Sequence, residues 1–280
     1  PCRFLPEGEE KGRRGRMEGL ISSRENPTVK LCRRLRSSAR ERREEGLFLA
    51  EGVRLCREAL SAFPGAGTLL ATREALEKNP WLEEAPAARL LRITPEVAGA
   101  VSDTAAPQGV FYLCPLPEER DLPLEPRGRY LLLDGLQDPG NLGTIIRGAE
   151  AFGITGLVLS RECPDCFSPK VLRSTMGSVF RQPIRRCGDL AAEVHRMREA
   201  GIRTYAAALD PGGVGARALE DCPEGLAVVV GNEGNGVSPR VLAACGTAVY
   251  IPMAPGIESL NAAAAATVLM WEMSGRSRRV

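Results

Sequence analysis

The sequence lacks long apolar stretches. No run of about 20 apolar residues occurs in its 280 residues, so we expect no membrane-spanning helix. Residues 1–16 are polar and basic and hold no apolar core of the kind that secretory signals carry. We interpret them as a flexible extension and expect a cytoplasmic protein. The formal net charge is only +2, which excludes a protein that binds nucleic acid through its charge as a whole.

Patterns typical of metal sites and disulfides are scarce as well. Nine cysteines, an odd number without regular spacing, indicate reduced thiols rather than a disulfide framework. One CxxC occurs, at Cys163 and Cys166, but a zinc site needs a second pair of ligands and the only histidine is His195. We therefore favour ordinary reduced cysteines over a metal or redox site, and we expect no metal.

Positive charge is concentrated in one short segment, residues 30–43. Leu31, Leu35 and Ala39 repeat every four residues there, which predicts one helix with a single buried face. The other faces are either simply solvated or contact RNA phosphates, which guanidinium groups bind bidentately. The segment alone favours neither interpretation. The cations are Lys30, Arg33, Arg34, Arg36, Arg40, Arg42 and Arg43, of which Lys30, Arg33, Arg34 and Arg40 are the candidate RNA contacts.

Proline and acidic residues divide the chain. Four prolines and four acids fall within the thirteen residues 114–126, which predicts a stiff, solvated linker over 115–127. Before it, residues 17–114 alternate short apolar runs with amphipathic stretches and predict a small α/β domain. Its expected strands are Leu47–Ala50, Thr68–Ala71, Arg89–Ile93 and Gly109–Leu113, with a helix at Val53–Ala62.

Strands and helices alternate from residue 128 to 280, which predicts a parallel sheet covered on both faces. The expected strands are Tyr130–Leu133, Leu157–Ser160, Ile202–Ala207, Leu226–Val230 and Ala248–Ile251. The expected helices are Asn141–Phe152, Pro169–Met176, Leu190–Ala200, Pro239–Ala244 and Ser259–Met273. A ligand of such a sheet binds beyond the carboxyl ends of the strands.

Three polar segments begin at that edge. The first reads N-x-G-x-x-x-R from Asn141, the predicted helix cap, to Arg147. The second, Gly231–Gly236, holds three glycines that allow close approach of a ligand. The third, Ser259-Leu260-Asn261, opens an alanine-rich helix. Ser and Asn cap helices by accepting hydrogen bonds from the first backbone N–H groups, and the positive end of the helix attracts anions.

Each segment alone has a plain structural explanation: a turn with a cap and a surface arginine, a flexible loop, and a tightly packed helix. A dinucleotide site is the main competitor for the glycine-rich loop. The glycine order is GxxGxG rather than GxGxxG, however, and no Walker lysine follows it. We therefore set both nucleotide-binding interpretations aside.

As a set, the three segments resemble a known family. N-x-G-x-x-x-R, G-x-E-x-x-G and Ile251-Pro252-Met253 with S-L-N, in this order and spacing, are similar to the SpoU (TrmH-like) RNA 2′-O-methyltransferases of the SPOUT superfamily, over residues 128–275. The N-terminal region resembles that family's substrate-binding domain, which is similar to ribosomal protein L30e. Its marks are Ile21-Ser22-Ser23 with Asn26-Pro27, Leu47–Gly52, and Ser102-Asp103-Thr104 with Pro107-Gln108-Gly109.

The resemblance implies a deep trefoil knot in the C-terminal domain and a homodimer with active sites at the subunit interface. It also implies S-adenosylmethionine as cofactor, held by backbone groups of Gly231, Ile251 and Leu260 and by the loop after Ala207. Relatives commonly have valine and serine after S-L-N, where this chain has alanines at 262–264. We expect this difference to alter packing more than chemistry.

The resemblance makes Arg147 the base that accepts the ribose proton. Because a guanidinium has a pKa above about 12, we assign Arg147 instead to clamping the target phosphate and ribose. Asn141, Ser259 and Asn261 would orient them, and Glu233 would either organise its loop or help to receive the proton. The expected function is methylation of a ribose 2′-hydroxyl in structured RNA. We favour 23S ribosomal RNA; the alternatives are transfer RNA and a catalytically silent RNA-binding protein.

Overall fold

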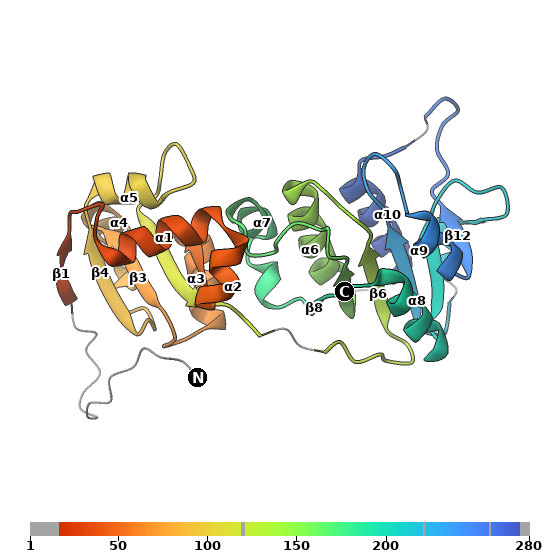
Figure 1. The fold of residues 1–280 in the computed structure, drawn as a ribbon, viewed down its shortest axis with the longest axis horizontal. Helices are drawn as coiled ribbons and strands as arrows, with labels where there is room; N and C mark the ends of the chain where they lie inside the picture. The colour runs from red at the N-terminus through yellow and green to blue at the C-terminus, as the bar shows by residue number, and fades with distance from the viewer. Residues whose placement is uncertain (1–16, 119–120, 221, 258, 275–280) are drawn as a thin grey trace.

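A computed structural model of the chain describes residues 17–118, 121–220, 222–257 and 259–274. They form two lobes, each built on one β-sheet and lying side by side (Figure 1). The predicted flexible extension at 1–16 lies outside the described residues. No helix within the described ranges combines the length and apolarity that crossing a membrane requires.

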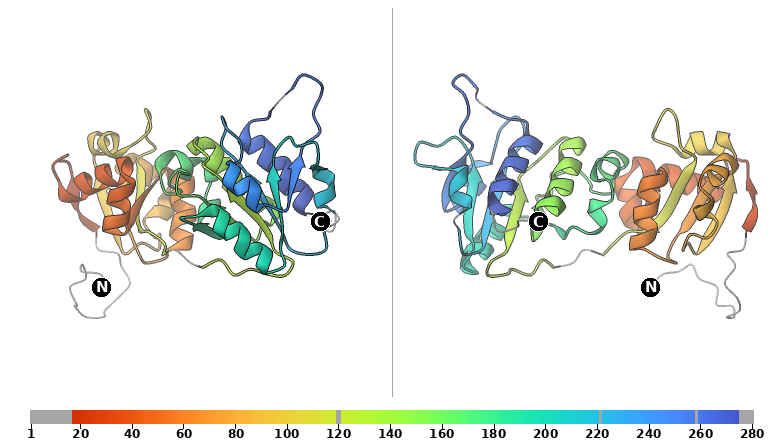
Figure 2. Two further views of the ribbon diagram at one scale, coloured as in Figure 1. Left: turned by 45° about the vertical axis from the view of Figure 1, so that its right-hand side comes forward. Right: turned by 180° about the vertical axis from the view of Figure 1, so that it is seen from behind.

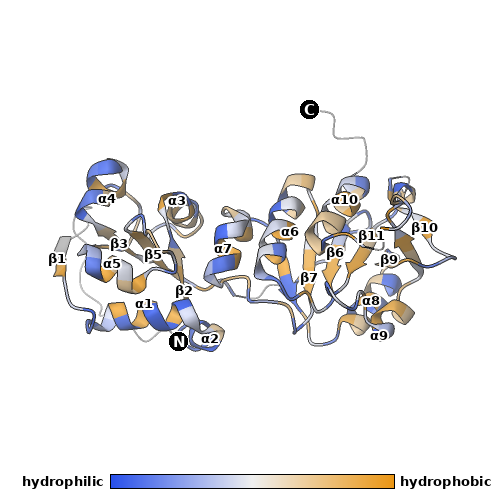
Figure 3. Cartoon of the chain, turned by 90° about the horizontal axis from the view of Figure 1, so that it is seen from above, coloured by the Kyte–Doolittle hydropathy of each residue, from blue (hydrophilic) through white to orange (hydrophobic). Residues whose placement is uncertain are grey.

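The N-terminal lobe has a mixed five-stranded sheet with strand order β1-β4-β3-β5-β2. Its strands are β1 Met17–Ile21, β2 Leu47–Glu51, β3 Thr68–Thr72, β4 Arg89–Ile93 and β5 Val110–Pro115. Its α-helices are α1 Pro27–Ser37, α2 Ala39–Glu45, α3 Val53–Ala62, α4 Arg73–Lys78 and α5 Pro95–Val101. A 3-10 helix, η1 Pro80–Leu82, follows α4. Helices α1 and α5 cover one face and α3 and α4 the other (Figure 3).

The single helix predicted over the basic segment is wrong. Ser38 has extended backbone (φ −132°, ψ 117°), which ends α1, and its hydroxyl accepts a hydrogen bond from the Glu41 N–H, which starts α2. The capping serine thus divides the segment into two helices, although the basic composition continues across it. The buried side of α1 consists of Val29, Cys32 and Leu35, whereas Leu31 and Ala39 are only partly buried.

The C-terminal lobe has a seven-stranded sheet, order β10-β12-β9-β11-β6-β7-β8, in which every pairing is parallel. The strands are β6 Arg129–Leu133, β7 Gly156–Leu159, β8 Ile184–Arg186, β9 Arg203–Ala207, β10 Val214–Gly215, β11 Leu226–Val230 and β12 Thr247–Tyr250. The α-helices are α6 Pro139–Phe152, α7 Pro169–Thr175, α8 Leu190–Glu199, α9 Pro239–Ala244 and α10 Ala262–Ser274, with 3-10 helices η2 Ser178–Phe180 and η3 Ala216–Leu219.

This sheet is covered on both faces. Helices α10, α6 and α7 line one face, as the view from behind in Figure 2 shows, and α8 and α9 cover the other (Figure 3). The middle strand β11 is fully buried because it pairs with both β6 and β9. The predicted α/β class with a parallel-sheet domain is confirmed.

The segment between the sheets is not solvated throughout, contrary to its composition. Leu122 is only 5% exposed and packs with Tyr130 and Val158 in the core of the second lobe. The Tyr130 hydroxyl donates to the Pro123 carbonyl (3.0 Å) and accepts from the Glu125 N–H (2.7 Å). The residues from Leu122 onward are therefore part of the C-terminal lobe.

Candidate active site

The three polar segments lie at the carboxyl edge of the seven-stranded sheet. The first lies in the first turns of α6, which follows β6, the second follows β11, and the third lies in the long loop of Figure 1 that joins β12 to α10. Because β6 and β11 are hydrogen-bonded neighbours, their loops meet directly. A buried parallel sheet presents its ligand-binding loops at this edge.

Glu233 ties the first two segments together. Its carboxylate accepts hydrogen bonds from the Gln137 N–H (3.0 Å), the Asp138 N–H (3.1 Å) and the side-chain amide of Asn141 (2.9 Å). Asn232, beside it, donates to the Gly135 carbonyl at 2.8 Å. The glycine-rich loop thus fixes the loop from which α6 starts.

The third segment joins this network through its asparagine. The Asn261 side-chain N–H donates to Oδ1 of Asn141 at 3.1 Å. Oδ1 of Asn261 accepts from the N–H groups of Ala263 (2.9 Å) and Ala264 (3.2 Å), so Asn261 caps α10 as predicted. A chain of hydrogen bonds, Glu233–Asn141–Asn261, therefore links all three segments.

Two predicted helix starts need correction. Helix α6 begins at Pro139, and its cap is Asp138, whose Oδ1 accepts from the Asn141 N–H at 2.9 Å. An Asp followed by a proline in the first helical position is a strong start signal, and it frees the Asn141 side chain for the network. Helix α10 begins at Ala262, so Ser259 precedes the helix.

Asp138 is a site residue that the motif comparison missed. Its other oxygen pairs with Nζ of Lys170 at 2.9 Å, on the first turn of α7. The hydrogen bond from Lys170, followed by the Asn141 N–H, holds the pKa of Asp138 below its usual value. The Asp-Pro dipeptide was the sequence signal for this residue, whereas nothing in the sequence pointed to Lys170.

Glu233 carries a negative charge that its surroundings favour. Partial burial by itself would raise the pKa of this carboxyl group, but the hydrogen bonds from Asn141, Gln137 and Asp138 together outweigh it and lower the pKa. A carboxylate with a lowered pKa is a weak base. The geometry therefore favours the loop-organising role of Glu233 over the proton-accepting one.

Arg147 and Ser259 stand outside this network. Arg147 is exposed on α6 and forms no hydrogen bond or ion pair with any residue that the structure describes. Ser259 is exposed too and is likewise unpaired within the described ranges. A guanidinium without a described partner, on the helix that carries Asn141, is suited to hold a phosphate.

The glycine-rich loop is tightly folded at Gly231. A Cβ there would lie 2.0 Å from the carbonyl carbon of Gly236, so only glycine fits. Exposed apolar side chains stand on the loops after β9 and β12: Leu209 (65% exposed), Ile257 (53%) and Leu260 (41%). The predicted cofactor residues Ala207 and Ile251 are half-buried at the ends of the same strands. Exposed apolar groups at a sheet edge fit a partly apolar ligand.

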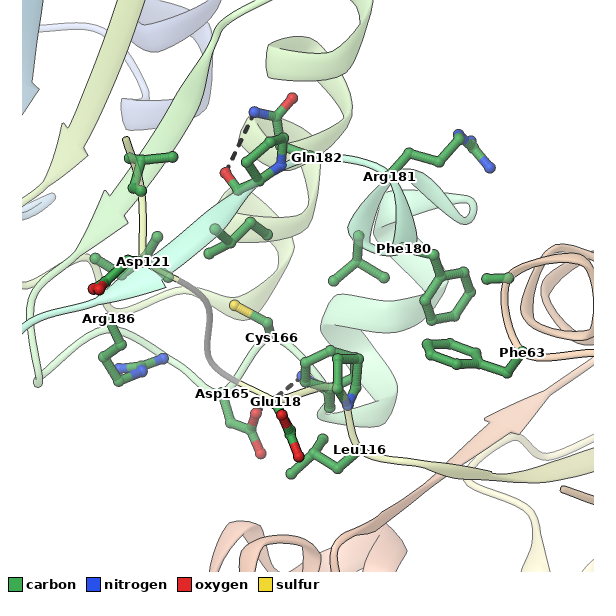
Figure 4. A pocket seen from close by; sticks show the side chains of 18 of the residues that line it. Phe63, Leu116, Glu118, Asp121, Asp165, Cys166, Phe180, Arg181, Gln182 and Arg186 are labelled. Carbon is green, nitrogen blue, oxygen red and sulfur yellow. Dashed lines mark hydrogen bonds between the residues drawn. The ribbon is translucent and has the colours of Figure 1, made fainter. Parts of the chain in front are cut away.

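A cavity lies away from these residues. It measures about 820 Å³, lies between the lobes, and none of the predicted catalytic or cofactor residues lines it (Figure 4). Two of the polar side chains on its wall are already engaged: Gln182 donates to the Ile154 carbonyl at 3.0 Å, and Arg186 donates to carbonyls from Ser160 to Pro164. This cavity offers no free polar groups from those side chains for a ligand.

The predicted RNA contacts are exposed on α1 and α2, but three of them are already paired with acids. Arg33 forms no ion pair with a described residue. The pairs are Lys30–Glu25 (2.7 Å), Arg34–Glu45 (2.8 Å) and Arg40–Glu44 (2.7 Å). Exposed pairs of this kind are worth about 0–1 kcal/mol, so a phosphate competes with them readily.

The CxxC cysteines lie in the core. Cys163 and Cys166 are both buried and free, and burial raises the pKa of each, for Cys166 to about 12. Among the described residues no group of three or more His, Cys, Asp or Glu side chains could hold a metal ion. His195 is exposed on α8, across the sheet from α6 and α10.

Comparison with known proteins identifies the family. Residues 128–271 match the model of the SpoU rRNA Methylase family, and residues 26–111 match the MRM3-like substrate binding domain. The chain is 35% identical to the 23S rRNA (guanosine(2553)-2′-O)-methyltransferase RlmP of Bacillus subtilis, over 91% of this chain and 99% of the relative. It is also 35% identical to an uncharacterized tRNA/rRNA methyltransferase of Synechocystis, over 90% and 92% of the two chains.

A solved structure shares the fold. The AdoMet-bound rRNA methyltransferase from Sinorhizobium meliloti superposes with a TM-score of 0.78 at 30% identity, over 91% of this chain and 97% of that chain. The family match spans the three hydrogen-bonded segments of the carboxyl edge up to Asn261 and most of α10. The chain therefore belongs to the SpoU rRNA methylase family of RNA methyltransferases, which confirms the predicted resemblance.

Proposed function

We propose that this chain transfers the methyl group of S-adenosylmethionine to a ribose 2′-hydroxyl of 23S ribosomal RNA in the cytoplasm. The observation that carries the proposal is the Glu233–Asn141–Asn261 chain, which draws three distant segments to one edge of the sheet. The match to RlmP over nearly its whole length supports the choice of 23S RNA.

The residues at the carboxyl edge fit this cofactor. S-adenosylmethionine supplies a methyl group on a sulfonium centre. Backbone groups of Gly231, Ile251 and Leu260, with the loop after Ala207, would hold it. Support comes from the lack of space for a side chain at residue 231 and from the exposed apolar side chains of the surrounding loops.

The remaining residues would act on the RNA. Asn141 and Asn261 present fixed amides that orient the target ribose, and Ser259 assists them. Arg147 binds the adjacent phosphate, and Glu233 keeps the Asn141 amide in place. Positioning supplies much of the rate, since effective molarities of about 10⁵ M or more are reached by well-oriented groups.

The finer details of the fold are part of the proposal. We place the substrate-binding domain, of L30e type, at 17–114, the linker at 115–127 and the methyltransferase domain at 128–280, and the linker from Leu122 onward packs on the methyltransferase domain. A trefoil knot in the last domain is supported by the path of α10. After β12, near the edge of the sheet, the chain returns as α10 to contact η3, α6 and the middle strand β11.

A homodimer is also proposed, with the active sites at the subunit interface. Helix α10 exposes Ala264, Val268 and Trp271, spaced so that they share one helix face. Trp271 is 63% exposed and packs edge-to-face on Phe152 of α6. An exposed apolar stripe of this kind is typical of a surface that a second copy covers.

The test compares two RNAs. Purified protein with radiolabelled S-adenosylmethionine should methylate 23S ribosomal RNA at one ribose and leave transfer RNA unlabelled. Labelling of transfer RNA alone would favour the second candidate, which the name of the Synechocystis relative leaves open. The ribose-methylation map of a strain without the gene should lose one site, and an unchanged map would contradict the proposal.

A further inference from the structure

The two lobes share one apolar core. Phe48, fully buried on β2, packs against two rings of the other lobe, with centroid distances of 5.0 Å to Phe167 and 5.8 Å to Phe180. Phe63, beside it, lies 5.7 Å from Phe180 in an edge-to-face arrangement, and these two rings face each other in Figure 4. One cluster of buried side chains therefore continues from the first sheet to the second.

A buried ion pair closes the same contact. Arg42 on α2 is only 3% exposed, and both its Nε and one terminal nitrogen lie 2.7 Å from the same Asp165 oxygen in the C-terminal lobe. Its other terminal nitrogen donates to the carbonyls of Leu35 and Arg36 at the end of α1. Every nitrogen of this guanidinium is thus committed, so Arg42 cannot bind RNA as its neighbours on the helix can.

Further contacts flank this pair. Arg173 on α7 pairs with Asp103 at 2.8 Å, and Arg181 pairs with Glu58 of α3. Glu58 also packs over Gly177, where a Cβ would lie 2.6 Å from the Glu58 side chain. These two pairs are partly exposed and therefore contribute less than the buried one.

The loop that carries Asp103 is itself fixed. Glu51, at the end of β2, accepts hydrogen bonds from the Asp103 N–H and the Thr104 hydroxyl, both at 3.0 Å. Strand β2 also carries Phe48, and it contacts α7. Helix α7 packs so closely on α6 that a Cβ at Gly143 would lie 2.4 Å from the Ser174 side chain. The contact between the lobes thus reaches the helix that carries Asn141 and Arg147.

From this geometry we propose that Arg42 is a positioning residue. It fixes the position of the N-terminal lobe relative to the C-terminal lobe. An RNA bound by the first lobe therefore presents one defined ribose to Asn141 and Asn261. The net stability gained from such a pair is small, because removing charges from water offsets much of their attraction, so its role here is to select one arrangement of the lobes. The part of this inference that concerns RNA rests on the proposed function, whereas the part that concerns the packing of the two lobes is independent of it.

The proposal predicts separate effects on structure and on kinetics. Arg42→Met removes the charge and the hydrogen-bonding guanidinium group but keeps much of the side-chain volume. The lobes should then separate in part, which raises the radius of gyration in small-angle scattering and speeds protease cleavage within residues 115–127. The kcat/KM for a long 23S fragment should fall by about 100-fold, a loss of the size that a misplacement of roughly 1 Å can cause.

Two comparisons isolate the positioning role. Arg43→Met removes the same charge from the next residue of α2, which is exposed, and should leave scattering and proteolysis unchanged. Binding of S-adenosylmethionine, measured by calorimetry, should be the same in wild type and Arg42→Met, because the cofactor edge belongs to one lobe. Arg42→Lys, which keeps the charge without the guanidinium group, should restore only part of the RNA activity.

Clear outcomes would overturn the proposal. If Arg42→Met matches Arg43→Met in scattering, proteolysis and kcat/KM, Arg42 does not position the lobes. Should Arg42→Met fail to fold, Asp165→Asn replaces it, since this variant leaves Arg42 its carbonyl partners and should give the same separation of the lobes. If the wild-type protein methylates no RNA, the proposed function fails, while scattering and proteolysis still decide whether Arg42 locks the lobes.

Discussion

Polar side chains at the carboxyl edge of the seven-stranded sheet pair over long sequence distances, whereas the exposed cations of α1 and α2 that form ion pairs do so with near neighbours. Asn141 is hydrogen-bonded to Glu233 and Asn261, which lie 92 and 120 residues further along the chain. Arg40, by contrast, pairs with Glu44 one helical turn away. The first arrangement needs the complete fold, and the second needs only a helix.

The difference shows what each region is suited to do. Exposed local pairs are worth about 0–1 kcal/mol and exchange partners easily, which suits a surface that meets RNA phosphates. A network that joins three loops fixes its amides before any ligand arrives, which suits a site where catalysis depends on preorganised groups. The four predictions below test this contrast, from the largest expected effect to the smallest.

Arg147→Ala should lower methylation by about 10³-fold at saturating cofactor and RNA, because a positioned charged donor at a reacting site is worth about that factor. Arg147 has no described partner to lose, so the melting temperature should not change. Single-turnover methylation and thermal melts of the same samples measure both effects. Near wild-type activity in this variant would remove Arg147 from the site.

Asn141→Ala and Asn261→Ala should each reduce methylation by about 100-fold, since either substitution breaks the hydrogen-bond network that aligns the ribose. The double variant should lose less than the sum of the two, with a coupling energy of about 1 kcal/mol. Asn261→Ala should also destabilise the protein by about 1 kcal/mol, because it uncaps α10. Fully additive effects would mean that the two amides act independently.

Glu233→Gln should show that this carboxylate organises the loops through its charge. The folded pKa lies below the unfolded value, so the stabilisation is present above the ordinary glutamate pKa and is lost as pH falls through the lowered one. Thermal melts should therefore separate wild type from Glu233→Gln at pH 7, and the difference should shrink on acidification below about pH 4. A difference that persists unchanged in acid would point to packing instead.

Arg33→Ala and Arg40→Ala should change stability by less than about 0.5 kcal/mol, as expected for exposed cations. If they contact phosphates, each should reduce the slope of log affinity against log salt by about 1. Filter binding of a 23S fragment at several salt concentrations measures this slope. An unchanged slope in both variants would mean that this face of α1 and α2 is only solvated.

Much of the fold follows from local patterns. The strands Arg89–Ile93 and Leu226–Val230 and the helices Val53–Ala62 and Pro239–Ala244 have the predicted bounds, because apolar periodicity and turn residues mark their ends. The break at Ser38 was missed because composition continues across it, and only the capping hydrogen bond reveals the second helix.

The candidate site divides in the same way. The identities and order of Asn141, Glu233 and Asn261 were readable, and they led to the family. Their mutual hydrogen bonds were not readable, nor was Lys170 beside Asp138. Which side chains meet at a sheet edge depends on the strand order, and no local pattern gives the pairing of β6 with β11.

The sequence by itself determined the class of the fold, the places of most elements and the family of RNA methyltransferases to which the chain belongs. Only the tertiary structure decided which charges are available to a ligand. Arg42 and Arg43 are adjacent and chemically identical, yet one is buried against Asp165 and the other is exposed. The reason is physical: burial and pairing depend on which surface the other lobe covers, and that surface exists only after both sheets have formed.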